Sequence, residues 1–204
     1  MDRKQHWERV YIDKAVHETS WHQANPAPSL SMIRAASAGG TPSLIDVGGG
    51  ASLLVDHLLD LGYRDLAVLD IAGAALEQAR RRLGPKAAEV QWIEVDVTNF
   101  EPARTWEIWH DRAAFHFLTE AADRARYGEV LNQALVDGGQ AIIAAFAPDG
   151  PVRCSGLDIV RYDAASLEAE LGAAFTLQEE RYEVHRTPAG REQRFGFHRF
   201  RKRS

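Results

Sequence analysis

Apolar residues along the chain alternate between short continuous runs and longer stretches in which they recur at helical spacing. The short runs predict five buried strands, near 43–47, 65–70, 90–95, 106–110 and 140–147. The longer stretches predict helices, near 52–61, 73–83, 119–135 and 163–171. Strands that alternate with helices in this way form a mainly parallel sheet with helices on both faces. The pattern therefore predicts an α/β fold.

The C-terminal part of the chain follows a different pattern. Residues 175–185 and 192–201 read as two strands joined by the turn Thr187-Pro188-Ala189-Gly190. A tight turn joins antiparallel neighbours and cannot make a parallel crossover. We therefore expect a Rossmann-like, seven-stranded, mostly parallel sheet whose last strand is antiparallel.

The N-terminal segment does not fit the alternation of strands and helices. Its periodicity is weak up to the prolines of Asn25-Pro26-Ala27-Pro28, after which a helix is expected to begin at Leu30. We interpret residues 1–41 as a helical cover over the ligand edge of the sheet and residues 42–204 as the main domain. Two bulky residues, Trp7 and Tyr11, are interpreted as packing anchors of this cover.

Trp21 and His22 allow two interpretations. They are either further anchors or part of a mobile aromatic cover that keeps water out of a ligand pocket.

Three glycines follow the first strand, in Leu44-Ile45-Asp46-Val47-Gly48-Gly49-Gly50. Glycine tolerates positive φ and carries no Cβ, so the backbone can turn sharply and lie against a ligand. Asp46 can hold this loop by accepting backbone N–H bonds, and Ser52 is available as the N-cap of the next helix. An ordinary glycine turn is the alternative interpretation.

The second strand ends in Asp70, 24 residues after Asp46. A carboxylate at this strand tip is placed to bind the two hydroxyls of a ribose, which favours a nucleoside cofactor. A dinucleotide fingerprint requires a third glycine where Leu53 stands, and this departure argues against NAD.

The D-x-G-x-G pattern with an acid after the second strand resembles class I S-adenosylmethionine-dependent methyltransferases. The third strand also ends in Asp96-Val97, as in that family. The resemblance implies S-adenosylmethionine as cofactor and S-adenosylhomocysteine as product. It places the cofactor against a set of motif residues, Asp46, Gly48, Gly50, Asp70, Ile71, Asp96 and Val97.

The fourth strand runs into His110-Asp111-Arg112-Ala113-Ala114-Phe115-His116, which lies across the switch point from the glycine loop. This is the expected place of the methyl acceptor. His116, His110 and Asp111 are candidate proton acceptors. Arg112 can orient an anionic group of the acceptor or pair with Asp111.

The same residues could instead have purely structural roles. Asp111 and Arg112 can form a buried pair that braces the strand end, and His116 can be a core histidine. Phe115 and Cys154, with Trp21 and His22, are the remaining candidates for the acceptor wall; a lone thiol is more typical of a wall than of a nucleophile.

Three segments, Trp109–Leu118, Cys154–Leu157 and Thr19–Trp21, resemble the subgroup of the citrate synthase lysine methyltransferase. Asp111-Arg112-Ala113 is also similar to thiopurine methyltransferases. We therefore expect methyl transfer to N, S or O of a small molecule, with a protein lysine as the alternative acceptor. An NAD-dependent oxidoreductase and a binding module without turnover remain as further alternatives.

Composition narrows the class of partner. The chain has 204 residues, 45% hydrophobic residues and a formal net charge of −5, which gives no general attraction to nucleic acid. A single cysteine excludes an intrachain disulfide and a cysteine-rich metal site. The sequence shows no leader-like or membrane-spanning apolar run. We expect a cytoplasmic protein without a metal, either monomeric or a weak homodimer.

Overall fold

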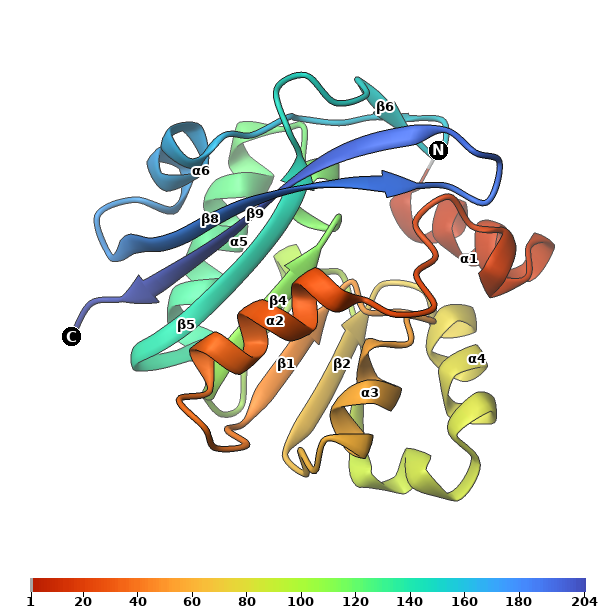
Figure 1. Ribbon diagram of the computed structural model, residues 1–204, viewed down its shortest axis with the longest axis horizontal. Helices are drawn as coiled ribbons and strands as arrows, with labels where there is room; N and C mark the ends of the chain where they lie inside the picture. Colours follow the sequence, from red (N-terminus) through yellow and green to blue (C-terminus); the bar gives the residue numbers. More distant parts are fainter. Residues whose placement is uncertain (1) are drawn as a thin grey trace.

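The computed structural model describes residues 2–204, so that only Met1 of the expected cover lies outside the described residues. A seven-stranded sheet forms the centre, in the order β3-β2-β1-β4-β5-β9-β8 (Figure 1). Its strands are β1 (Leu44–Val47), β2 (Leu66–Asp70), β3 (Val90–Glu94), β4 (Trp106–Arg112), β5 (Leu135–Phe146), β8 (Phe175–Arg186) and β9 (Glu192–Lys202). A separate two-stranded ribbon is made by β6 (Arg153–Cys154) and β7 (Leu157–Asp158).

The direction of the strands agrees with the expected fold. β1 pairs in parallel with β2 and β4, β2 with β3, and β4 with β5. β9 is antiparallel to both of its neighbours, β5 and β8. The predicted Rossmann-like sheet with an antiparallel last strand is confirmed.

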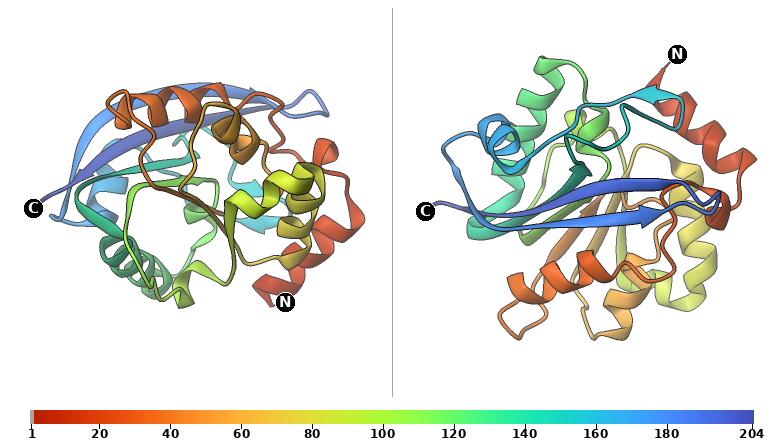
Figure 2. Two further views of the ribbon diagram at one scale, coloured as in Figure 1. Left: turned by 90° about the horizontal axis from the view of Figure 1, so that it is seen from below. Right: turned by 45° about the horizontal axis from the view of Figure 1, so that its top comes forward.

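Helices cover both faces of the sheet. They are α1 (Arg3–Asp13), α2 (Ala27–Ala36), α3 (Leu54–Asp60), α4 (Gly73–Leu83), α5 (Ala121–Ala134) and α6 (Ala164–Leu171). Figure 2 shows α2 and α3 over one face and α5 over the other, while α1 lies at the edge beside α4. The helices predicted at 73–83 and 163–171 match α4 and α6 closely.

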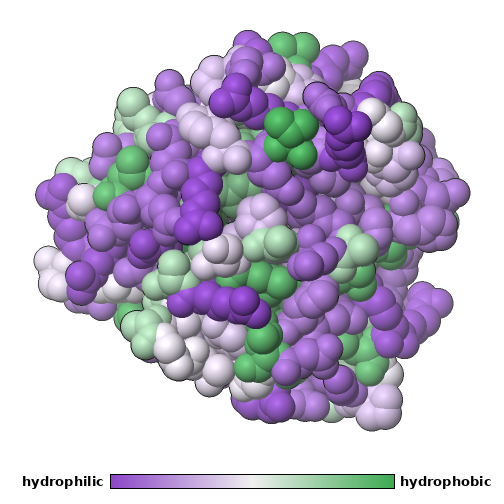
Figure 3. Space-filling model, viewed as in Figure 1, coloured by the Kyte–Doolittle hydropathy of each residue, from purple (hydrophilic) through white to green (hydrophobic). Residues whose placement is uncertain are grey.

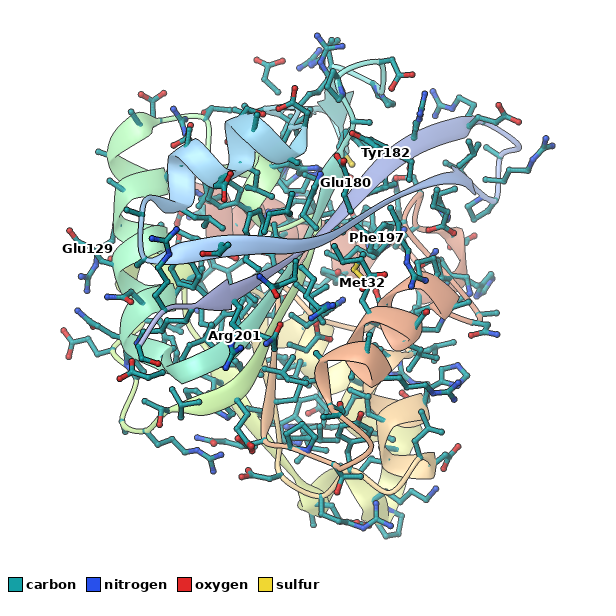
Figure 4. All side chains as sticks on the ribbon, turned by 60° about the vertical axis from the view of Figure 1, so that its left-hand side comes forward. Met32, Glu129, Glu180, Tyr182, Phe197 and Arg201 are labelled. Carbon is teal, nitrogen blue, oxygen red and sulfur yellow. The ribbon has the colours of Figure 1, made fainter. Side chains whose placement is uncertain are left out.

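Alternate side chains of each strand enter two different cores, as a two-sided sheet requires. Leu44 of β1 packs in the core under α2 and α3, whereas its neighbour Ile45 packs in the core under α5. Met32 of α2 and Phe197 of β9 belong to the first of these cores, and Figure 4 shows them on the same side of the hairpin. Through this core, α2 of the N-terminal segment packs against the C-terminal strand β9.

Three elements differ from the sequence predictions. α1 lies within the segment predicted as a helical cover, but its bounds could not be read from the weak periodicity, since among its residues only Tyr11 is fully buried. α2 begins at Ala27, not at Leu30, because Pro28 fits the first turn of a helix, where no N–H partner is needed. β5 begins at Leu135, directly after α5, with an irregular register against β4 between Trp106 and Ile108.

Within residues 2–204, every helix is too short or too polar to traverse a bilayer.

Candidate active site

A cavity with an internal volume of about 100 Å³ lies at the carboxyl ends of β1, β2 and β4 and opens to solvent. β1 lies between β2 and β4, so the strand order reverses here, and such a switch point is where open α/β sheets bind ligands. The cavity is lined by eight of the site residues predicted from the sequence, namely Trp21, Gly48, Asp70, Ile71, Asp96, Val97, Arg112 and Cys154.

The glycine loop forms one edge of the cavity. Gly48 and Gly50 have φ values of +67° and +45°, in the left-handed region that favours glycine. A Cβ on Gly48 would lie 2.6 Å from the Cβ of Ala114, and a Cβ on Gly50 would lie 2.8 Å from Oδ2 of Asp70. Gly48 therefore brings bare backbone to the cavity. Gly50 packs against Asp70 and is not part of the wall.

Asp70 ends β2 and is buried in the cavity wall. Its Oδ1 accepts a hydrogen bond of 2.8 Å from the backbone N–H of Ala72. Burial raises the pKa of Asp70 to about 7, and the negative charges of Asp46 and Glu8 act in the same direction. Hydroxyl donors of a ligand would therefore stabilise the ionised form of this buried carboxylate.

Asp96 follows β3 and is held at both oxygens. Oδ1 accepts from the backbone N–H and the hydroxyl of Thr98, at 2.9 and 2.8 Å. Oδ2 lies 3.5 Å from Nη1 of Arg3. The neighbouring Val97 and the residue Ile71, after β2, add apolar surface to this end of the cavity. Such a site can bind a flat ring that carries an amino group, because the acid accepts from the amino N–H and the apolar side chains pack on the ring faces.

The helix α1 is attached to the tips of the strands by charged groups. The two carboxylate oxygens of Glu8 accept from the backbone N–H groups of Gly73 and Ala74, at 2.7 and 3.1 Å, at the start of α4. Lys4 Nζ lies 2.6 Å from Glu94 Oε1, at an exposed position. An acid at a helix N-terminus satisfies free N–H groups and the helix dipole, so Glu8 fixes α1 over the cavity.

Aromatic side chains of the N-terminal segment close the cavity from above. Trp7 packs edge-to-face on Trp21 and on Phe117, with ring centroids 5.7 and 4.9 Å apart, and Tyr11 lies 6.0 Å from Trp21. All four rings line the cavity. The interpretation of Trp7 and Tyr11 as packing anchors was therefore incomplete, because their rings are also part of the wall.

His110 and Asp46 form a structural bridge below the cavity. The imidazole Nδ1 of His110 lies 2.7 Å from Asp46 Oδ1, and Nε2 lies 2.9 Å from the hydroxyl of Ser29. Both ring nitrogens are thus engaged, and the ring is buried between β4, β1 and α2. His110 lines only the smaller, second cavity described below, and its role as a proton acceptor stays a prediction.

Asp111 holds the turn after β4. Its carboxylate accepts from the backbone N–H groups of Ala114 and Phe115, at 2.9 and 3.1 Å, and from the hydroxyl of Tyr127 at 2.8 Å. Burial raises its pKa to about 6, against the effect of these donors. Asp111 is fully buried, does not line the cavity and does not pair with Arg112. It positions the turn, in which Ala113 has a φ of +70°.

His116 and Phe115 point into the protein interior. His116 is fully buried against Phe117 and Phe146, and its two nitrogens have no hydrogen-bond partner within residues 2–204. Burial lowers its pKa to about 3, with the charge of Arg112 acting in the same direction, so the imidazole stays neutral. Phe115 packs on Tyr127 in the opposite core. The predictions that His116 is the base and Phe115 an acceptor wall do not agree with these positions.

Arg112 and Cys154 stand at the end of the cavity away from Asp70 and Asp96. Nη1 of Arg112 donates to the carbonyl of Trp21 at 3.1 Å, and the guanidinium lies 4.6 Å from the ring centroid of Phe195. Burial raises the pKa of the Cys154 thiol, so that it is a neutral wall group. Sequence reasoning missed Phe195, because alternation along a strand does not tell which of its residues reach a cavity.

His22 does not line this cavity. It lies in the wall of a second, smaller cavity on the other side of Trp21, together with Asp46, Gly48 and Arg112. Burial lowers its pKa. The two cavities share Tyr11, Trp21, Gly48 and Arg112, so they meet above the glycine loop.

Comparison with known proteins agrees with this geometry. Residues 44–139 match the family described as "Methyltransferase domain". The matched residues include the glycine loop, Asp70, Asp96 and the turn after β4. The match covers a little under half of the chain and agrees with the predicted methyltransferase activity.

A relative and two solved structures are similar to parts or all of the chain. The mouse eEF1A lysine and N-terminal methyltransferase is 30% identical over 67 residues, which are 32% of this chain and only 10% of that longer protein. The N-methyltransferase NodS of Bradyrhizobium japonicum, solved with S-adenosylhomocysteine, superimposes over 100% of both chains with a TM-score of 0.74 at 15% identity.

The second structure is the 1,6-didemethyltoxoflavin-N1-methyltransferase of Burkholderia thailandensis, solved with 1,6-didemethyltoxoflavin and S-adenosylhomocysteine. It covers 98% of this chain and 84% of its own, with a TM-score of 0.70 at 19% identity. At these identities the two structures show that the fold is shared.

Proposed function

We propose that the protein transfers the methyl group of S-adenosylmethionine to a nitrogen, sulfur or oxygen atom of a small molecule by in-line displacement. One observation carries the proposal. A single cavity joins two fixed acids, Asp70 and Asp96, to a chamber closed by aromatic rings. A nucleoside cofactor fits the first end, and a small acceptor fits the second.

The residues of the first end fit the cofactor. Asp70 would accept from the ribose hydroxyls, Asp96 would accept from the adenine amino group, and bare backbone at Gly48 leaves room for the remainder. Bound there, the cofactor supplies a sulfonium methyl group as electrophile. Val97 and Ile71 would flank the adenine ring.

The aromatic cover would exclude water from the reacting atoms. Trp7, Tyr11 and Trp21 pack on one another above the cavity, and Glu8 fixes the helix that carries two of them. In-line displacement needs alignment of the acceptor with the methyl carbon more than it needs a catalytic group. None of the three predicted proton acceptors lines the main cavity, so we propose a reaction driven by alignment and by a neutral or already deprotonated acceptor.

The small-molecule acceptor is supported by the form of the cavity and of the surface. The aromatic rings that cover the chamber favour an acceptor small enough to be enclosed beneath them. Figure 3 shows a mostly polar face on which apolar residues form small, separate patches. Both solved structures named above are N-methyltransferases, and one of them is solved with 1,6-didemethyltoxoflavin bound.

A protein lysine is the second candidate acceptor. It is favoured by the short match to the mouse lysine methyltransferase and by the resemblance of the turn after β4 to the citrate synthase lysine methyltransferase subgroup. The similarity of Asp111-Arg112-Ala113 to thiopurine methyltransferases favours a small acceptor instead.

Incubation with methyl-tritiated S-adenosylmethionine separates the two acceptor classes. The protein is mixed with a cell extract that has been divided by ultrafiltration into small molecules and proteins. We expect label in the small-molecule fraction only, and no transfer by the Gly48→Val variant, whose side chain would collide with Ala114. Label on a protein band, with none in the small-molecule fraction, would contradict the proposed acceptor class.

A further inference from the structure

We infer that Arg112 is a binding site for a carboxylate group on the acceptor, so that the substrate class is an anionic small molecule with an apolar or aromatic body. The inference rests on the proposed function and specifies the acceptor end of the same cavity. It is carried by the position and the unused hydrogen-bond donors of this one guanidinium group.

The guanidinium of Arg112 is buried but only partly satisfied. Nη1 donates to the carbonyl oxygen of Trp21, and the group lies over the ring of Phe195. Nε and Nη2 are buried and have no hydrogen-bond partner within residues 2–204. A buried donor without a partner is costly, and more so when it carries charge. A hydrogen-bond acceptor on a bound ligand would therefore stabilise the free edge of the guanidinium, formed by Nε and Nη2.

The acids around Arg112 do not fill this role. Asp111, the preceding residue, is turned toward the backbone of its own turn and toward Tyr127. Glu183 of β8 favours the charged form of Arg112, but it does not line the cavity. Its Oε1 accepts from Gln23, and its buried Oε2 has no hydrogen-bond partner within residues 2–204, Arg112 included. Asp46 is engaged with His110.

The arginine remains a cation at neutral pH. Burial lowers the pKa of Arg112 to about 10, while Glu183, Cys154 and Asp46 act in the opposite direction. Burial lowers the pKa values of His116 and His185, which lie near enough to Arg112 for its charge to lower them further, so both imidazoles are neutral. A planar fork with two free N–H-bearing atoms matches the geometry of a carboxylate.

The surroundings of Arg112 define the rest of the acceptor. Phe117, Phe195 and Trp21 give the chamber apolar walls, and Gln193 and the neutral thiol of Cys154 add weakly polar ones. The acceptor thus needs an apolar body between the rings and an anionic head at Arg112. Its reacting atom would face the cofactor end of the cavity.

A second opening supplies a route for this acceptor. Trp21, Cys154 and Gln193 also line an outer groove between the turn after β8 and the β6–β7 ribbon. Lys14, Arg153 and Arg191 lie along that groove together with two acids, Glu18 and Glu192, so its charge is mixed with a small excess of cations. The acceptor can therefore reach Arg112 without displacing the cofactor.

The test uses benzoate and benzamide as probes of the same shape and different charge. Each is titrated into the full-length protein, free and saturated with S-adenosylhomocysteine, and the fluorescence of Trp7 and Trp21 in the cavity wall reports binding. The variants are Arg112→Gln, Arg112→Lys and Arg9→Gln. Arg9 is exposed on α1, so Arg9→Gln makes the same change of charge outside the cavity.

We expect benzoate to bind at least about tenfold more tightly than benzamide, as one or two charge-assisted hydrogen bonds require. Arg112→Gln should remove this difference, Arg112→Lys should retain part of it, and Arg9→Gln should leave it unchanged. The affinity for S-adenosylhomocysteine should change little in all three variants, which also shows that they are folded.

Three results would overturn the inference. They are equal affinities of the wild-type protein for benzoate and benzamide, unchanged benzoate affinity in Arg112→Gln, and a loss of S-adenosylhomocysteine affinity in Arg112→Gln without any effect on benzoate. The last result would assign Arg112 to the cofactor's own carboxylate. Failure of the wild-type protein to bind S-adenosylhomocysteine contradicts the proposed function instead, and the titration of the free protein still tests Arg112.

Discussion

Replacing Asp70 by asparagine separates the charge of this side chain from its shape. The asparagine of Asp70→Asn would keep an oxygen that accepts from the backbone N–H of Ala72, and it would occupy the same buried space. It would lose the negative charge that we propose binds the ribose hydroxyls. The variant therefore tests whether the ionised carboxylate, and not the mere presence of a polar group, holds the cofactor.

The expected loss of affinity follows from the bonds involved. A hydrogen bond to a charged group contributes about 1.5 to 3 kcal/mol, and asparagine offers one neutral acceptor where aspartate offers two charged ones. At pH 8 we expect S-adenosylhomocysteine to bind Asp70→Asn about 10- to 100-fold more weakly than the wild-type protein, because about 1.4 kcal/mol corresponds to each tenfold change.

The pH dependence gives a second signature. Because the pKa of Asp70 is about 7 in the free protein, the wild-type side chain must release a proton before it binds both hydroxyls. Affinity should fall about tenfold for each pH unit below 7, or about 2 kcal/mol between pH 7 and pH 5.5. Asp70→Asn should show no such fall, since residue 70 no longer titrates.

Stability should change in the opposite direction. The pKa of Asp70 is higher in the folded than in the unfolded chain, so the unfolded state binds fewer protons and stability declines as the pH rises from about 4 to above 7. Asparagine removes this cost. The ligand-free variant should be more stable than wild type at pH 8, with about 4 kcal/mol as the ceiling, and the difference should shrink toward pH 4.

Titration calorimetry with S-adenosylhomocysteine from pH 5.5 to 8.5, and urea unfolding at pH 5 and 8, measure these effects. Equal affinity of the two proteins at pH 8 would refute the assignment of Asp70 to the ribose. Parallel pH profiles would show that another group controls binding.

Other predictions concern the turn after β4 and the cover. Tyr127→Phe removes a buried hydroxyl that donates to Asp111 and accepts from Trp109, so urea unfolding should show a loss of about 2 to 3 kcal/mol; a loss below about 0.5 kcal/mol would contradict this network. Glu8→Ala removes the attachment of α1, and stopped-flow measurements should show S-adenosylhomocysteine dissociating about fivefold faster, whereas an unchanged rate would mean that α1 does not limit release. His116→Phe should keep turnover within about threefold of wild type, because the imidazole lies outside the cavity; a drop of several hundredfold would restore it as the base.

Much of the sheet could be predicted because its signals are local. The glycine loop, the acid after β2 and the turn at Thr187–Gly190 each combine a short pattern with a fixed backbone requirement. The bounds and the position of α1 within the expected helical cover could not be predicted, because only Tyr11 is buried along it and its position depends on contacts such as Glu8 with the start of α4. Such contacts join distant parts of the chain and leave no periodic signal.

The turn after β4 shows the limit of motif reasoning at the site. The sequence places His110, Asp111, Arg112 and His116 near the switch point, but it does not tell which way each side chain points. The side chain of His110 is hydrogen-bonded to Asp46, and that of Asp111 accepts hydrogen bonds from backbone N–H groups. The side chain of His116 is buried in the core. Arg112 is the one of these four whose side chain reaches the main cavity.

The central claim is that a cofactor nucleoside lies across the carboxyl ends of β1 and β2, beneath α1, with its reacting end toward Arg112. A crystal structure of the protein grown with S-adenosylhomocysteine tests it most directly. We predict density with the ribose hydroxyls at Asp70, the adenine beside Asp96 and Val97, and the sulfur facing the aromatic chamber. Density for the ligand at another place on the sheet, or a cavity still closed by its own side chains at saturating ligand, would contradict the account.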